Sequence, residues 1–220
     1  MIHPWTLTID DAKMLQHRLS KLVEETDQFG EISLVAGVDM SGVRAAGEAK
    51  AAAVLLSFPK LEPLEESSAQ GPLKFPYIPG FLSFREAPLM LEALEGLSRE
   101  PDIIIVDGQG RAHPRRLGIA SHLGLILDKP TIGCAKSRLI GEFGELGSEP
   151  GSTAPLMDKD ELIGTVLRTK RGAKPVFVSV GHRISLMTAV DLVMRCVLPG
   201  RRLPEPIRLA HLAAGRLSTP

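Results

Sequence analysis

The stretch PDIIIVDGQGRAHPRRLGIASHLG, residues 101–124, decides the fold. Its β-branched run IIIV, residues 103–106, is too short for a buried helix and has no polar alternation, which is typical of a strand covered on both faces of a parallel sheet. Asp107 and a Gly-Gln-Gly turn follow directly. Ligands in open α/β sheets bind beyond the carboxyl ends of strands, so Asp107 lies where chemistry usually occurs. Asp and Gly also simply favour turns, so this stretch alone leaves both interpretations open.

A second strand of the same design ends in Asp39. Residues 33–39 (SLVAGVD) form a short apolar run, and residues 50–58 (KAAAVLLSF) follow after a short turn. Together they predict an antiparallel hairpin. The acidic segment 61–71 is expected to be a solvated sheet edge or a loop. Two strands that each end in an aspartate indicate a functional site more strongly than either strand alone.

Further periodic segments predict an α/β fold with a mixed central sheet flanked by helices. Strands are expected over residues 131–136, 161–168 and 175–180, and helices over residues 10–23, 83–97, 117–127, 185–197 and 207–217. Thr8 or Asp10 can cap the first helix. Residues 141–154 are rich in Gly, Ser, Pro and Glu and predict a flexible loop.

Residues 75–88 (FPYIPGFLSFREAP) contain the chain's single tyrosine between two prolines. Pro76 and Pro79 restrict the backbone on either side of Tyr77, which predicts a stiff, hairpin-like tip that presents the ring. A core position for Tyr77 is the alternative. Further along, Ser83 and Glu86 fit a capping box, in which the glutamate only stabilises a helix start.

Composition bounds the classes of protein that this chain can represent. Its 220 residues, 44% hydrophobic, predict one globular domain over residues 1–220. The formal net charge of +0 argues against a purely electrostatic nucleic-acid carrier, but not against an enzyme with local basic patches. Cys134 and Cys196 have no metal-type spacing and predict buried free thiols. No apolar run approaches a membrane span and the first ten residues lack a signal-peptide core, so we expect a cytoplasmic protein without a membrane partner.

The candidate chemistry is that of a hard divalent cation. Asp39, Glu86 and Asp107 offer oxygen donors without a cysteine cluster, which suits Mg²⁺, or Mn²⁺ as a substitute. Lys136 follows a buried strand, where it is either a solvated strand end or a phosphate contact. The nearest histidines by topology are His113, His182 and His211. This set predicts phosphodiester hydrolysis, and the sequence has no Walker motif, dinucleotide fingerprint or G-x-S-x-G elbow that would compete.

Six motifs, in order, resemble endonuclease V, the deoxyinosine 3′-endonuclease family. They are VAGVDMSG, which begins at residue 35, PYIPGFLSFRE, DGQGRAHPRRLGIASH, PTIGCAKS, VGHRIS and PGRRLPEPIRLAH. The match covers nearly the whole chain, from Gly37 to His211. The resemblance implies a ribonuclease H-like fold in which Asp39, on the first strand, and Asp107, on the fourth, are neighbours.

The resemblance also implies a role for individual residues. Asp39, Glu86 and Asp107 would hold the metal, with His211 close by, and Lys136 and His113 would contact or stabilise the scissile phosphate. The DNA wedge would be Pro76, Tyr77, Ile78 and Pro79, and the base pocket would come from main chain around Gly80, Leu82, Gly108 and Gly118, where missing side chains allow close approach.

The implied activity is Mg²⁺-dependent hydrolysis of the second phosphodiester bond 3′ to deoxyinosine in DNA, leaving 3′-hydroxyl and 5′-phosphate ends. The same fold can act on inosine in RNA, and we expect a monomer. The alternatives are another ribonuclease H-like, structure-specific nuclease, such as a junction resolvase, and a non-catalytic nucleic-acid binding protein. The aromatic wedge argues against the first. Three carboxylates crowded where phosphates would bind argue against the second.

Overall fold

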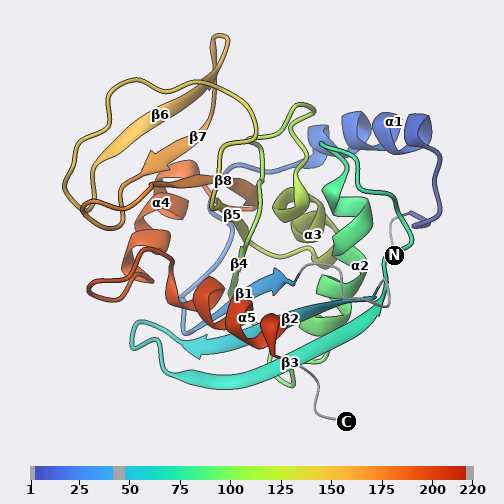
Figure 1. Cartoon of the computed structure of the whole chain (residues 1–220), viewed down its shortest axis with the longest axis horizontal. Coiled ribbons are helices and arrows are strands. Elements are labelled where there is room, and N and C mark those ends of the chain that lie inside the picture. Colours follow the sequence, from blue (N-terminus) through green and yellow to red (C-terminus); the bar gives the residue numbers. More distant parts are fainter. Residues whose placement is uncertain (1–2, 42–47, 217–220) are drawn as a thin grey trace.

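A computed structural model describes residues 3–41 and 48–216, whose strands form one twisted sheet crossing the molecule (Figure 1). The order is β3-β2-β1-β4-β5-β8-β7-β6. The strands are β1 (Leu34–Met40), β2 (Glu48–Ser57), β3 (Pro63–Pro72), β4 (Ile103–Val106), β5 (Thr131–Ala135), β6 (Thr153–Asp158), β7 (Glu161–Leu167) and β8 (Val176–His182).

The pairing of the strands confirms the mixed sheet. β4 lies between β1 and β5 and is parallel to both, while the other neighbours are antiparallel. The central IIIV run is therefore a buried parallel strand as predicted. The antiparallel pairing of β1 with β2 is also confirmed, although most of the turn predicted between them lies outside the described residues. The acidic segment forms the edge strand β3. The expectation of a single domain over residues 1–220 stays a prediction, which this shared sheet supports.

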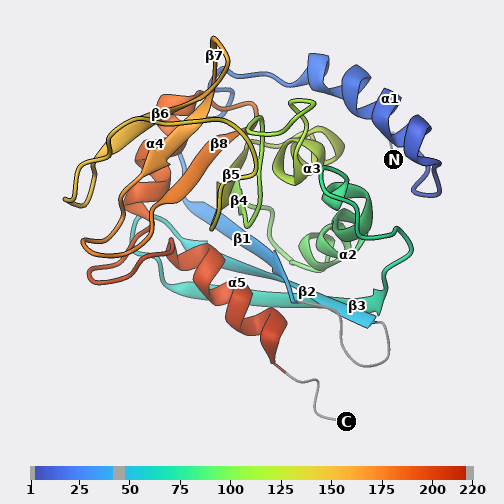
Figure 2. The ribbon, with the colours of Figure 1, turned by 45° about the horizontal axis from the view of Figure 1, so that its top comes forward.

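Helices cover both faces of the sheet (Figures 1 and 2). They are α1 (Ile9–Leu19), α2 (Leu82–Glu95), α3 (Ile119–Leu127), α4 (Leu186–Arg195) and α5 (Glu205–Gly215). Side chains of β4 alternate: Ile103 and Ile105 belong to the core under α4 and α5, and Ile104 and Val106 to the core under α2 and α3. This period of two, on a strand that is apolar throughout, explains why both faces need a helical cover.

Several predictions of local structure were wrong. β6 begins within the predicted loop 141–154 and was missed. Ser83 does not cap α2, because the helix begins one residue earlier, at Leu82, and the Ser83 hydroxyl is buried without a hydrogen-bond partner. The first helix is capped by Thr8 but ends at Leu19 and continues only as a short 3₁₀ turn, Ser20–Leu22, which leaves Leu22 exposed.

Other expectations hold within the described residues. The Cys134 and Cys196 thiols are free and buried. The last helix, expected over residues 207–217, is present but runs from Glu205 to Gly215, and Leu217 lies outside the described residues. Among the described helices, none combines the length and the apolar character that crossing a membrane requires.

Candidate active site

The carboxylates of Asp39 and Asp107 meet at one edge of the sheet. Asp39 lies near the end of β1, Asp107 directly follows β4, and the Asp107 amide donates to the Val38 carbonyl at 3.0 Å. Because β1 and β4 are parallel neighbours, their carboxyl ends coincide. Asp39 is only 5% exposed, so its charge is held largely out of water.

His211 joins the two aspartates because α5 packs very closely against β1. At Gly37, an added Cβ would lie 2.1 Å from the backbone carbon of Pro206, so only glycine permits this approach. One turn and a half further along α5, His211 Nδ1 lies 2.7 Å from Asp39 Oδ2. One ligand atom each from Asp39, Asp107 and His211 lies within 4.8 Å of the others, a group that fits a divalent cation.

Lys136, just beyond β5, places its ammonium between the two aspartates. Its Nζ donates to Asp39 Oδ2 at 3.2 Å, forms an ion pair with Asp107, and lies 3.3 Å from His211 Nδ1. The Lys136 carbonyl is held in turn by the Arg202 guanidinium at 2.8 Å. Lys136 is thus a member of the acidic site and not a solvated strand end.

Burial and crowding of like charges perturb the carboxyl groups of the site. Burial, and then the charge of Asp39, raises the pKa of Asp107 to about 6, although Lys136 opposes the shift. Burial, followed by the charge of Asp39, also raises the pKa of Glu86 to about 7. Burial lowers the pKa of Lys136, but the charges of Asp107 and Asp39 outweigh it, so its net pKa is raised. Perturbed carboxyl groups of this kind cluster at functional sites.

Glu86 lies on α2, outside the group of three formed by the aspartates and His211. It feels the charges of both aspartates, which places it beside them electrostatically. Its role as a metal ligand stays a prediction.

A pocket of about 380 Å³ opens beside the acidic site. All four residues predicted for base recognition line it, namely Gly80, Leu82, Gly108 and Gly118. Asp107 and Lys136 line it as well, so the pocket and the acidic site share a wall. Three of the predicted wedge residues, Tyr77, Ile78 and Pro79, form part of its rim, whereas Pro76 does not line it.

The segment that carries Tyr77 is an irregular loop and not the hairpin-like tip expected. Tyr77 is 72% exposed, which rules out the core position. Phe75 and Phe81, on either side of the loop, are buried and pack with Phe84 of α2, so they anchor an exposed aromatic ring on a rigid base.

The carbonyl of Gly80, at the pocket wall, accepts hydrogen bonds from three side chains. The donors are Gln16 at 3.0 Å, His113 Nε2 at 3.0 Å and Arg115 at 2.6 Å. Gly80 has φ of +81°, and an added Cβ would lie 2.9 Å from Arg115, so a side chain here is doubly unfavourable. The loop that carries Tyr77 is therefore held at Gly80 by three side chains.

His113 supports this wall as a neutral imidazole. Its Nδ1 accepts from the Arg115 amide at 3.2 Å while Nε2 donates to Gly80, so both ring nitrogens are engaged. Burial, and then the nearby Arg115 charge, lowers its pKa to about 4. The direct phosphate contact expected of His113 stays a prediction.

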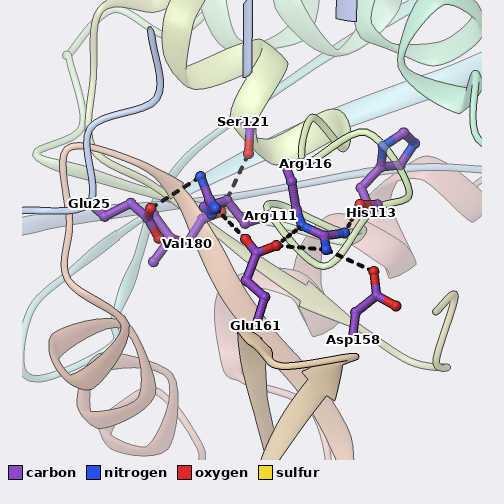
Figure 3. A network of polar contacts seen from close by, with 8 residues as sticks. All are labelled: Glu25, Arg111, His113, Arg116, Ser121, Asp158, Glu161 and Val180. Atoms are coloured by element: carbon purple, nitrogen blue, oxygen red, sulfur yellow. Dashed lines mark hydrogen bonds and ion pairs between the residues drawn. The ribbon is translucent and has the colours of Figure 1, made fainter. Parts of the chain in front are cut away.

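Two arginines of the same loop form an ion-pair cluster with distant acids (Figure 3). We call this the arginine clamp; its members are Glu25, Arg111, Arg116, Asp158 and Glu161. Both arginine side chains are only 19% exposed. Carboxylates of the clamp therefore neutralise the charges of both Arg111 and Arg116.

The sequence did not point to several residues that shape the site. Gln16 is fully buried at the pocket, Arg202 holds the main chain of Lys136, and Glu161 binds both arginines of the clamp. Their sequence neighbourhoods gave no signal, because each acts on a segment at least 45 residues away. His182 is not part of the group of three; its Nδ1 accepts a hydrogen bond from the Glu24 amide at 3.2 Å instead.

Comparison with known proteins places this site in context. The family model described as Endonuclease V matches residues 17–212. An Endonuclease V of Dehalococcoides mccartyi (strain CBDB1) is 53% identical over 98% of this chain and 96% of its own length. The crystal structure of the Endonuclease V from Streptomyces avermitilis superposes with a TM-score of 0.90 at 40% identity, covering 96% of this chain and 92% of that one. The Ciona intestinalis Endonuclease V, in complex with a 24mer DNA containing an inosine followed by a ribo-adenosine, gives a TM-score of 0.81 at 27% identity, with 94% and 95% coverage.

Proposed function

Because this chain belongs to the endonuclease V family, we propose that it recognises deoxyinosine in DNA and hydrolyses the second phosphodiester bond 3′ to it, leaving 3′-hydroxyl and 5′-phosphate ends. The chain is an endonuclease with the ribonuclease H-like α/β fold of that family. The observation that carries the finer proposal is the shared wall between the pocket and the acidic site, at Asp107 and Lys136.

The pocket suits a single nucleobase turned out of a duplex. Enzymes that inspect a base in this way bind it in a snug cavity and offset the cost of unstacking. Glycines 80, 108 and 118 leave main chain at the pocket wall. An added Cβ at Gly118 would lie 2.2 Å from the Gln109 carbonyl oxygen, so the main chain at Gly118 already packs against the main chain at Gln109 and leaves no space for a side chain.

The exposed ring of Tyr77 suits the place that the base vacates. Its two flanking prolines restrict the loop before binding, so little conformational entropy remains to be lost. Stacking of an aromatic ring on a base contributes about 1–3 kcal/mol, which is of the order of the unstacking cost.

The acidic site suits Mg²⁺, with Mn²⁺ as a substitute. Asp39 and Asp107 would hold the ion, with His211 and Glu86 beside it. Two hard carboxylates and one imidazole are acceptable donors for both ions. When bound, a divalent cation would supply activation of the attacking water and charge stabilisation of the leaving oxyanion.

The remaining side chains orient and neutralise. The Lys136 ammonium, which neutralises the aspartates in this structure, can reach a phosphate oxygen from the same position. Asp39 fixes the orientation of His211 through the 2.7 Å contact at Nδ1. Arg202 limits the movement of Lys136 by holding its carbonyl.

A cleavage assay with mapped products tests this proposal. The substrate is a 5′-labelled duplex with one deoxyinosine, incubated with Mg²⁺ or with EDTA beside the same duplex without the lesion. We expect one product, one nucleotide longer than the fragment that would end at the inosine, only with Mg²⁺ and only on the lesion strand. Cleavage of a four-way junction but not of the inosine duplex would favour a junction resolvase, and binding without cleavage in any metal would favour a binding protein.

A second candidate substrate is inosine in RNA. The strand bound by the Ciona intestinalis relative carries a ribo-adenosine after its inosine, which shows that a relative accommodates a 2′-hydroxyl there. The same assay with an inosine-containing RNA strand measures the preference.

We further propose a monomer in the cytoplasm, where the two unpaired buried thiols would stay reduced.

A further inference from the structure

The arginine clamp joins three parts of the chain that are far apart in sequence. Arg111 and Arg116 lie at the two ends of the loop 111–116, Glu161 begins β7, and Glu25 follows the first helix (Figure 3). The Oε1 atom of Glu161 accepts from Arg111 at 2.7 Å, and its Oε2 atom accepts from Arg116 Nε at 2.9 Å. One carboxylate therefore closes both ends of a six-residue loop.

The conformation of Arg116 shows that the clamp holds the loop in a shape it would not adopt alone. Arg116 has φ of +56°, a left-handed conformation that residues with side chains disfavour. Its guanidinium binds Glu161, Asp158 and the His113 carbonyl, the last at 2.9 Å. These contacts stabilise the unfavourable backbone.

An unbroken series of hydrogen bonds runs from the clamp to the pocket. Glu161 binds Arg116, Arg116 donates to the His113 carbonyl, and the His113 ring donates to the Gly80 carbonyl at 3.0 Å. His113 is 4% exposed and has no room to move independently of the loop. A displacement of the clamp is thus transmitted to the wall of the pocket.

The charges of the clamp argue against a direct contact with nucleic acid. Two guanidinium groups face three carboxylates, from Glu25, Asp158 and Glu161, so the cluster has no positive charge left for a phosphate. Ordinary exposed ion pairs contribute little to the stability of a folded protein. Here both arginine side chains are only 19% exposed, and one carboxylate, itself 44% exposed, binds both, a two-pronged geometry that adds specificity to such contacts.

We propose that Glu161 is a positioning residue: it holds the loop 111–116, and through this loop the base pocket, in the shape that discriminates a lesion from an ordinary base. The inference rests on the proposed function. It assigns a role in recognition to a residue that touches neither the pocket nor the acidic site.

The test is Glu161→Gln, which keeps the size of the side chain but removes the charge that two arginines share. We expect the affinity for an inosine duplex to fall by about tenfold, equivalent to about 1.4 kcal/mol. Affinity for the undamaged duplex should stay equal or increase, because a negative charge has been removed. Single-turnover cleavage at saturating enzyme should fall by less than the affinity, since the acidic site is untouched. If Glu161 acted only through its charge, its removal would raise the affinity for the inosine duplex. A fall in that affinity therefore distinguishes positioning of the pocket from a simple charge effect.

The matched control is Glu149→Gln. Glu149 forms an exposed ion pair with Arg171, away from the arginine clamp. The variant therefore removes one negative charge without changing a contact of the loop 111–116. It should leave the ratio of inosine to undamaged affinity unchanged. Arg116→Lys serves as a second variant, because a single ammonium nitrogen replaces the three guanidinium nitrogens that contact Glu161, Asp158 and the His113 carbonyl; it should lower the same ratio.

Amide hydrogen exchange of the free protein supplies a measurement that does not depend on the substrate. Glu161→Gln should raise exchange in residues 111–118 and at residues 80–81, and Glu149→Gln should not. Unchanged exchange and an unchanged affinity ratio overturn the inference, as does an equal loss of affinity for both duplexes that follows the melting temperature. If the wild type shows no preference for inosine but the exchange effect is present, the proposed function fails and the positioning of the pocket wall by Glu161 stands.

Discussion

Substitution of Gly37 by alanine tests whether the close approach of α5 to β1 builds the acidic site. The new methyl carbon would lie 2.1 Å from the Pro206 backbone carbon, and ordinary contact begins at 3.4 Å. Because the obstacle is backbone, α5 must retreat by roughly 1.3 Å, the difference between these two distances. If α5 moves as a rigid unit, the 2.7 Å contact between His211 and Asp39 lengthens to about 4 Å and is lost.

The expected cost has two separable parts. Overpacking of this kind destabilises a protein by about 1–3 kcal/mol, and for a chain of this size each kcal/mol lowers the melting temperature by roughly 2–4 °C. Cleavage measured at 25 °C, well below the transition, should fall as far as it does in His211→Ala. His211→Ala should lose activity but keep most of its stability, because the His211 side chain is half exposed.

Differential scanning calorimetry and single-turnover cleavage measure the two parts. Gly144→Ala is the control, since an added Cβ there meets nothing within 4 Å. It should match the wild type in both assays. A Gly37→Ala protein with a melting temperature within about 1 °C of the wild type and full activity would refute the reasoning that only glycine allows α5 to deliver His211.

Three other variants address the metal site, the wedge and a buried histidine. Asp107→Asn should lower single-turnover cleavage by roughly three decades or more while leaving lesion binding in a gel-shift assay largely intact, because it removes a carboxylate but keeps the volume. Tyr77→Ala should lower affinity for an inosine duplex by roughly ten- to a hundredfold, with a smaller loss on an inosine single strand and no change in melting temperature, because the ring is exposed and stacks only on the substrate. Burial, and then the neighbouring His3, lowers the pKa of His122 to about 3 from 6.5, so the unfolded chain binds a proton first as the pH falls. The contribution of His122 to stability is therefore complete above pH 6.5, and below that pH it decreases by about 1.4 kcal/mol per pH unit; His122→Gln should remove this amount from the slope of unfolding free energy against pH in urea titrations.

Each of these three expectations has an outcome that contradicts it. Cleavage by Asp107→Asn within about tenfold of the wild type at saturating Mg²⁺ would remove Asp107 from the metal site. Equal losses on duplex and single strand in Tyr77→Ala would exclude the wedge. An unchanged pH slope in His122→Gln would mean that His122 is protonated in the folded state or neutral in both states.

Local patterns in the sequence were sufficient for the parts of the fold that depend on local chemistry. The IIIV run favoured a doubly covered strand, and the two prolines around Tyr77 favoured an exposed ring; both are observed. These two features depend on residue type and short spacing. The position of Asp39 beside Asp107 was instead implied by the resemblance to endonuclease V, and it depends on the parallel pairing of β1 with β4, which are far apart in the sequence.

Other features depend on contacts between distant segments, so the sequence did not reveal them. The capping box at Ser83 was wrong because the N-cap position is taken by Phe81, which is buried with Phe75 and Phe84, so that Ser83 lies inside the helix. β6 contains a proline and several exposed positions, and it is a strand only because β7 pairs with it. The partnership of Glu161 with Arg116 spans 45 residues and is fixed by the position of β7.

The base-pocket role of Gly80 and Gly118 was implied by the resemblance and stays a prediction. The structure shows that each of these glycines lies where a side chain would collide with a neighbour. Their partners, Arg115 for Gly80 and the Gln109 carbonyl for Gly118, could not be read from spacing alone.

The two outer strands of the sheet bear on how the protein behaves at high concentration. β3 begins and ends with proline, and its Glu65 and Glu66 are already engaged, by Ser98 and by Arg216. β6, at the opposite edge, carries Pro155, which has no amide hydrogen to offer. An incoming strand from another molecule would meet charge at one edge and a missing donor at the other. Chains crowded onto one nucleic acid can therefore lie next to each other without their sheets fusing into an aggregate.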